Sequence, residues 1–109
     1  MADENNENQL INPEDLLEEL NLDSTPENNT VVGGLIQSAQ ELVLDSVNQN
    51  LSASDVNADK IYIRAVKALA TALYFDRTLS QGMPLGVQIM ITHLKGRYAE
   101  WPQKSNNGK

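Results

Sequence analysis

The amino-acid sequence predicts a small all-α protein, a bundle of about four helices with disordered N- and C-terminal tails. Apolar residues recur at spacings of three and four in four separate segments, which is the helical period. The one strand-like stretch, "VQIMI", has no partner strand nearby, and an isolated pairing would be unstable. We therefore expect a helical domain over 12–101, an acidic arm over 1–11 in which Leu10 and Ile11 can dock on the domain, and a polar tail over 102–109.

The first helix is predicted from "NPEDLLEEL", directly after the arm. Asn12 can accept backbone N–H bonds as the N-cap, and Pro13 suits the first helical position. Leu16, Leu17 and Leu20 then give about two turns with one apolar stripe. A turn-rich connection, "NLDSTPENN", is expected to follow.

The second helix is predicted to run from a cap at Asn29 or Thr30 to about Asn48. Gly33 and Gly34 near its start each cost roughly 1 kcal/mol of helix propensity relative to alanine. Their expected benefit is the close approach of another backbone. A phosphate-binding loop is disfavoured because no Lys-Ser or Lys-Thr pair follows the glycines.

The third helix is expected to start at about Val56 or Asp59 and to end at Arg77, and its small residues favour it as the central helix. Its buried side is predicted at Ile61, Ala65, Val66, Leu69, Ala72, Leu73 and either Phe75 or Asp76.

The stretch "DRTLSQGMPLGVQIM" interrupts the apolar pattern before a fourth helix. Gly82 can adopt the left-handed conformation that closes a turn, and Pro84 is preset for the first position of a new helix. The fourth helix is expected to end near Trp101. Trp101 before a polar tail is either part of an aromatic cluster over the core or an anchor for a partner.

Charge is distributed very unevenly along the chain. Residues 1–59 carry thirteen acidic and no basic side chains, whereas residues 60–109 carry all eight Lys and Arg and two acids. Lys60, Arg64 and Lys67 are spaced to share one exposed helix face. Either the acidic part of one copy attracts the basic part of the next, which favours head-to-tail assembly, or the two parts neutralise each other within one subunit.

No catalytic or metal-binding pattern stands out. His93 is the single histidine and the chain has no cysteine, so a structural or solvent-facing His93 is expected. The carboxylates at 14, 15, 18 and 19 crowd one short helix and are explained by exposure. We expect neither enzyme activity nor a cofactor or metal. Without a secretory leader or an apolar run long enough to span a bilayer, a soluble intracellular protein is expected.

A small helical nucleic-acid-binding regulator is the alternative function. Two helices joined by a short glycine-containing turn occur in DNA readers, and Arg77, Lys95 and Arg97 add basic groups to the Lys60 row. Against this alternative, the sequence pI is about 4.5 and the fourth helix offers few polar groups for reading bases.

The order of these segments resembles the tailed-phage head-tail connector, or adaptor, proteins. The matching stretches are "EDLLEEL", "VVGGLIQSAQELVLDSV", "ALYFDR" and "TLSQGMPLGVQIMITHLKG". The resemblance covers about 13–101 and is most specific over 61–98, while the Asn-rich link between the first two helices is longer than usual. In that family an aromatic-acid-arginine helix end is followed by a glycine loop and a Pro-apolar-Gly start, here Tyr74, Phe75, Asp76, Arg77, Gly82, Pro84, Leu85 and Gly86.

The resemblance implies a structural protein, not an enzyme, that forms a head-to-tail ring of about a dozen copies. Such a ring lies below the portal, extends the DNA channel without sequence-specific binding, and joins a stopper or tail-completion protein. The implied location is the host cytoplasm during assembly and then the head-tail interface of the virion. The residues expected to contact subunits or partners are Lys60, Arg64, Lys67, Arg77, Gly82, Pro84 and Trp101.

Overall fold

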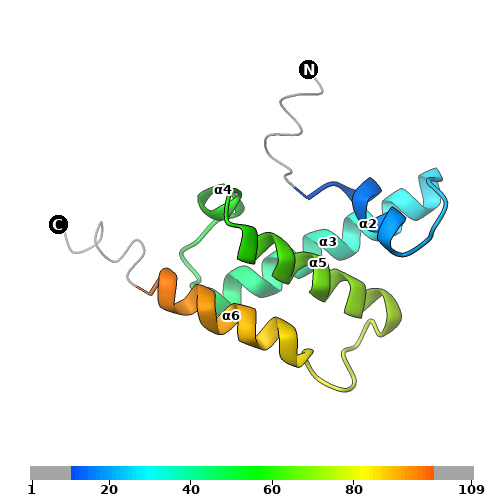
Figure 1. Ribbon diagram of the computed structural model, residues 1–109. Helices are drawn as coiled ribbons and strands as arrows, with labels where there is room; N and C mark the ends of the chain where they lie inside the picture. The colour runs from blue at the N-terminus through cyan, green and yellow to red at the C-terminus, as the bar shows by residue number, and fades with distance from the viewer. Residues whose placement is uncertain (1–10, 100–109) are drawn as a thin grey trace.

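A computed structural model describes residues 11–99, and this part of the chain is helical without any strand (Figure 1). The all-α prediction is therefore confirmed. None of the helices in 11–99 combines the length and apolar composition needed to cross a bilayer. The helices are α2 (Pro13–Glu19), α3 (Pro26–Val47), α4 (Ala53–Val56), α5 (Lys60–Phe75) and α6 (Leu85–Arg97).

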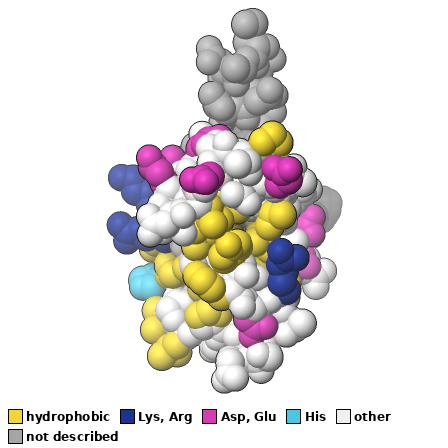
Figure 2. Space-filling model, turned by 90° about the vertical axis from the view of Figure 1, so that its right-hand side faces the viewer, with side chains coloured by type: hydrophobic (Ala, Val, Ile, Leu, Met, Phe, Trp, Pro, Cys, Tyr) yellow, Lys and Arg dark blue, Asp and Glu magenta, His cyan; other side chains and the backbone are white. Residues whose placement is uncertain are grey.

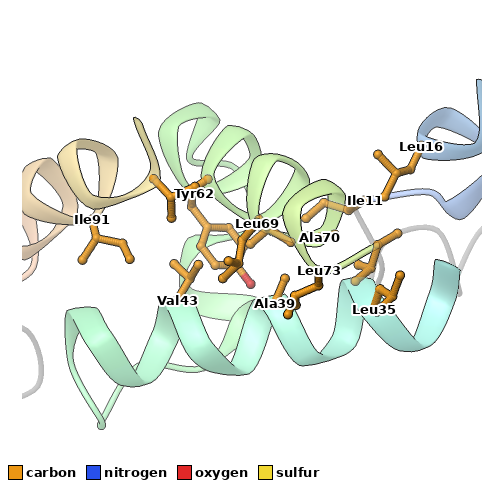
Figure 3. Close-up of a cluster of buried hydrophobic side chains, with 14 of the residues drawn as sticks. Ile11, Leu16, Leu35, Ala39, Val43, Tyr62, Leu69, Ala70, Leu73 and Ile91 are labelled. Carbon is orange, nitrogen blue, oxygen red and sulfur yellow. The ribbon is translucent and has the colours of Figure 1, made fainter. Parts of the chain in front are cut away.

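The long helix α3 is the platform on which the other helices pack. Helices α5 and α6 form an antiparallel pair against it, and α2 covers its N-terminal part (Figure 1). Figure 3 shows the buried side chains between α3 and α5, with Leu35, Ala39 and Val43 facing Leu69 and Leu73. One continuous core thus holds α2, α3, α5 and α6 together.

The start of α2 follows the predicted cap. The Asn12 side chain accepts a hydrogen bond from the Glu14 backbone N–H at 3.0 Å, and Pro13 occupies the first turn. Ile11 is only 2% exposed and belongs to the core, so the last residue of the expected arm is part of the domain. The rest of the arm and the 102–109 tail lie outside the described residues.

Helix α3 starts earlier than predicted. Thr25 is the cap, because its hydroxyl accepts the Asn28 backbone N–H at 3.1 Å, and Pro26 is the first helical residue. The prediction of a cap at Asn29 or Thr30 was wrong. Proline suits a first helical position as well as a turn, and the turn interpretation was the wrong choice here.

Two helices replace the single third helix that was predicted. Ser52 and Asp55 form a capping box that starts the single turn of α4, and Asp59 then caps α5. Of the two predicted starts, Asp59 is the cap of α5, whereas Val56 is the last residue of α4.

The buried side of α5 is partly different from the predicted side. Tyr62 and Ala70 are buried, whereas of the two residues predicted as alternatives for the last buried position, Phe75 is 74% exposed and Asp76 is half-buried. The helix ends at Phe75, and this ring packs edge-on against Tyr74 at 5.1 Å instead of entering the core. Ile61 and Ala72 are half-buried.

Helix α6 is shorter than expected at both ends. Pro84 has an extended backbone with ψ 144° and precedes the first helical residue, Leu85. Tyr98 ends the helix, and Trp101 lies outside the described residues.

The core contains one polar group without a partner, the hydroxyl of Tyr62, and we expect its removal to stabilise the fold. Tyr62 is 3% exposed, and its oxygen has no hydrogen-bond partner within the described chain. An unsatisfied buried hydroxyl costs roughly 1 kcal/mol or more, so Tyr62→Phe should raise the free energy of unfolding by about 1 kcal/mol in urea titrations.

Tyr98→Phe is the matched control for this change. The Tyr98 hydroxyl donates a hydrogen bond to Asp59 at 2.7 Å, so the same substitution there should lower the free energy of unfolding by about 1 kcal/mol. A destabilised Tyr62→Phe variant would contradict an unpartnered hydroxyl.

Candidate subunit-contact surfaces

A buried carboxylate joins the start of α5 to the end of α6. The Asp59 side chain is 4% exposed. It accepts hydrogen bonds from the backbone N–H groups of Ile61 (2.9 Å) and Tyr62 (3.3 Å), Arg97 Nη1 (2.8 Å) and the Tyr98 hydroxyl (2.7 Å). A single side chain therefore caps one helix and holds the last turn of its neighbour.

The protonation states of this cluster follow from its contacts. Burial acts to raise the pKa of Asp59, but the hydrogen bonds from Tyr98, Arg97 and the α5 backbone outweigh it and hold the pKa below 3.8. Burial, followed by the hydrogen bond to Asp59 and its charge, raises the pKa of Tyr98 to about 12. The Asn48 side chain donates to the Tyr98 carbonyl at 3.1 Å, so the end of α3 is attached to the same place.

A second aspartate orders the loop at the other end of the α5–α6 pair. One Asp76 oxygen accepts the Thr78 hydroxyl at 3.0 Å, and the other accepts the Ser80 hydroxyl at 2.6 Å and the Ser80 backbone N–H at 2.8 Å. These bonds, first among them those from Ser80, lower the pKa of Asp76. Leu79 has φ 51° and Gly82 has φ 83°, so two residues take the left-handed conformation. For Gly82 this confirms the prediction.

The predicted contact residues of this loop differ in exposure. Gly82 and Arg77 are exposed, and Pro84 is half-buried where α6 begins. Arg77 lies beside α3, at the edge of a groove described below. The loop is therefore a fixed, exposed feature between two helices.

The basic row on α5 is only partly available to a partner. Lys67 Nζ lies 2.7 Å from a Glu19 carboxylate oxygen at the end of α2. Lys60 and Arg64 are exposed, and neither makes an ion pair within residues 11–99. The acidic and basic parts of the sequence thus neutralise each other locally, at Lys67 and at Arg97, and leave the rest of the row free.

An apolar groove, which the sequence did not reveal, runs between α3 and the end of α5. Its volume is about 530 Å³ and it is open to solvent. Figure 2 looks onto the end of the molecule where α3 begins and α5 ends, and hydrophobic side chains gather in the middle of this face among charged ones. The α3 residues that line the groove include Val31, Gly34, Ser38 and Leu42, and those from the α5 side are Leu73 and Arg77.

The two adjacent glycines differ in their surroundings. A Cβ at Gly33 would lie 4.0 Å from the Pro13 ring of α2, whereas a Cβ at Gly34 would meet nothing within 4 Å. The expected close backbone approach is therefore seen at neither glycine, because the neighbour of Gly33 is a side-chain atom and Gly34 has none. This glycine instead leaves part of the groove open.

Helix α6 carries apolar side chains on two sides. Val87, Ile91 and Leu94 are buried, but Leu85 is 70% exposed and Ile89 is 54% exposed. Because apolar residues surround the helix, their spacing alone did not indicate which of them face inward.

The polar residues that the sequence offered as candidates do not come together in one site. His93 is exposed on α6, and the acids at 14, 15, 18 and 19 are exposed on α2. Residues 11–99 contain no group of three or more His, Cys, Asp or Glu side chains arranged to hold a metal ion.

Alanine at two exposed glycines, Gly34 and Gly82, should have opposite effects on stability. At Gly82 the positive φ of 83° penalises any side chain, so Gly82→Ala should lower the free energy of unfolding by about 1 kcal/mol. At Gly34, in the interior of a helix with free space around it, Gly34→Ala should raise it by about 1 kcal/mol. Urea titration measures both. Equal effects at the two positions would contradict the left-handed backbone at Gly82.

The buried carboxylate should make stability fall in acid. A pKa below the usual 3.8 in the folded chain means that the Asp59 contribution is complete above about pH 5 and is lost as the pH falls through 3.8 and below. Asp59→Asn should therefore cost about 2 kcal/mol at pH 7 and less at pH 3. Chemical denaturation of the unaltered chain and of Asp59→Asn at the two pH values measures this difference. The other carboxylates contribute equally to both proteins, so their pH dependence cancels in the difference. A pH-independent difference would contradict a charged Asp59 in the folded state.

Comparison with protein-family models, with curated proteins and with solved structures finds no match to this chain.

Proposed function

We propose that this chain is the ring-forming subunit of a tailed-phage head-tail connector. The observation that carries the proposal is the exposure of large apolar side chains on two different faces of one small bundle. Val31 and Leu42 are 38% and 39% exposed on α3, and Leu85 and Ile89 are more exposed on α6. Two separate apolar faces suit a subunit that has one neighbour on each side.

The fixed loop between α5 and α6 supports this role. In the connector family the aromatic-acid-arginine helix end and the following glycine-proline turn are the most specific features. Here Asp76 holds the turn through four hydrogen bonds, so Arg77 and Gly82 are presented in one geometry. A loop of this kind is suited to contact a portal, a neighbouring subunit or the channel.

The charge pattern supports a channel that does not bind DNA tightly. Asp15 and Glu18 are exposed on α2, and neither makes an ion pair within residues 11–99. Acidic side chains repel phosphates, so a ring with surplus acid toward its bore would let DNA pass without sequence-specific binding.

A nucleic-acid-binding regulator is a second candidate, favoured by one observation. Lys60 and Arg64 are exposed one helical turn apart and unpaired within the described chain. Two cations provide weak binding with a small salt dependence, because each phosphate contact releases only about one counterion. The connector therefore remains the better supported function.

Electron microscopy of the purified chain, alone and mixed with the portal protein of the genome that encodes it, tests the proposal. We expect rings of about a dozen copies of the chain, bound to the portal. In parallel, the anisotropy of a labelled DNA duplex should stay unchanged at micromolar protein concentration. A genome without a portal gene, or salt-sensitive duplex binding without any ring, would contradict the connector and favour the regulator.

A further inference from the structure

The outer face of α3 is an apolar stripe with acidic ends. Val31, Gly34, Ser38 and Leu42 follow one another at spacings of three and four, and together they line the open groove. Glu27 lies one turn before this stripe, and Asp45 lies one turn after it. Helix α3 has no basic residue, and Arg77 of the α5–α6 loop is the one cation that lines the groove within the described chain.

The outer face of α6 is an apolar stripe with basic edges. Leu85 and Ile89 lie one turn apart on it, exposed Thr92 and Gly96 continue the row at helical spacing, and the two large apolar side chains are exposed. Exposed His93 and Lys95 flank the stripe on its two sides. Helix α6 contains no acidic residue. Its charge is thus opposite to that of the α3 face.

The two faces also have complementary shapes. Gly34 and Ser38 have small side chains, so the α3 groove is open, and a side chain at Gly34 would meet no atom within 4 Å. Leu85 and Ile89 are large, project one turn apart and are 70% and 54% exposed. Ridges of large side chains packed into such grooves are how helices associate.

A second copy of this chain is the occupant that satisfies both faces at once. Within one molecule α3 and α6 pack against each other through their inner sides, so their outer faces cannot meet. A neighbour can bring its α6 stripe onto the α3 groove, and its own groove then remains free for the next copy. Such a contact joins two different surfaces and propagates into a ring or a filament.

We propose that copies of this chain associate head to tail, with Leu85 and Ile89 of one copy seated in the α3 groove of the next. This contact rests on the proposed connector function and deepens it, because it names the surfaces that would build the ring. It predicts that the acid at one end of the α3 stripe, Glu27 or Asp45, lies near Lys95 of the neighbour. It also makes the unpaired part of the Lys60 row unnecessary for the ring.

Two variants, each with one face damaged, test the contact. Gly34→Lys fills the groove and places a cation on the acidic face, and it should not harm the fold because the site is an exposed, uncrowded helix position. Ile89→Glu puts an acid in the middle of the α6 stripe, where the side chain is already half exposed. Gly34→Ala and Ile89→Val are the matched controls, and thermal unfolding checks that all four chains are folded.

The decisive measurement is the mixture of the two damaged chains, followed by sedimentation and by amide NMR with either chain labelled. Each variant alone should self-associate at least about tenfold more weakly than the unaltered chain. An equimolar mixture should form a one-to-one dimer and nothing larger, because one intact groove and one intact α6 stripe remain. Amide shifts should appear over 31–42 in labelled Ile89→Glu and over 85–96 in labelled Gly34→Lys.

The contact is overturned if the mixture gives no shifts up to about 1 mM of each chain, or if the shifts map to α2 or the Lys60 row. It is also overturned if either variant associates as tightly as its control. Loss of the contact together with intact rings on a portal would leave the connector function standing. A verified contact without rings on a portal would leave the head-to-tail contact standing and contradict the connector function.

Discussion

The orientation of α6 depends on the buried carboxylate of Asp59, and this orientation decides which apolar side chains of α6 remain exposed. Asp59 completes the first turn of α5 and at the same time accepts from Arg97 and Tyr98 at the far end of α6. At the opposite end of the pair, Asp76 fixes the connecting loop. Two aspartates, one at each end, thus leave the α5–α6 pair little freedom to slide or rotate.

Fixing α6 in this way has a consequence for solubility. A helix with apolar side chains all round can bury only one side in a bundle of this size. The rotation set by Asp59 buries Val87, Ile91 and Leu94 and leaves Leu85 and Ile89 in water. The exposed apolar face is therefore built into the fold, and association with another copy is the proposed way in which it becomes covered.

Local features of the fold could be predicted from the sequence, because they depend on neighbours in the chain. The Asn12 cap, the left-handed Gly82 and the Asp59 start signal are all of this kind. The start of α3 was missed because Pro26 suits a turn and a first helical position equally well. The burial of Phe75 was predicted incorrectly because α5 ends at this residue, and apolar periodicity does not reveal where a helix ends.

The candidate site could not be predicted in the same way, because it depends on which surfaces face each other. The pairing of Lys67 with Glu19 removes one member of the basic row, and only the packing of α2 near α5 reveals it. The apolar groove likewise forms only where α3 meets the end of α5. The sequence lists the charged and apolar residues, but their exposure depends on the fold.

Cysteine cross-linking tests the head-to-tail contact most directly, since the natural chain has no cysteine. Leu42→Cys and Ile89→Cys are made in separate chains and mixed under mild oxidation. We expect a disulfide-linked dimer in the mixture and little dimer in either chain alone, because a head-to-tail contact joins different residues. Equally efficient cross-linking within one variant, or none in the mixture, would contradict it.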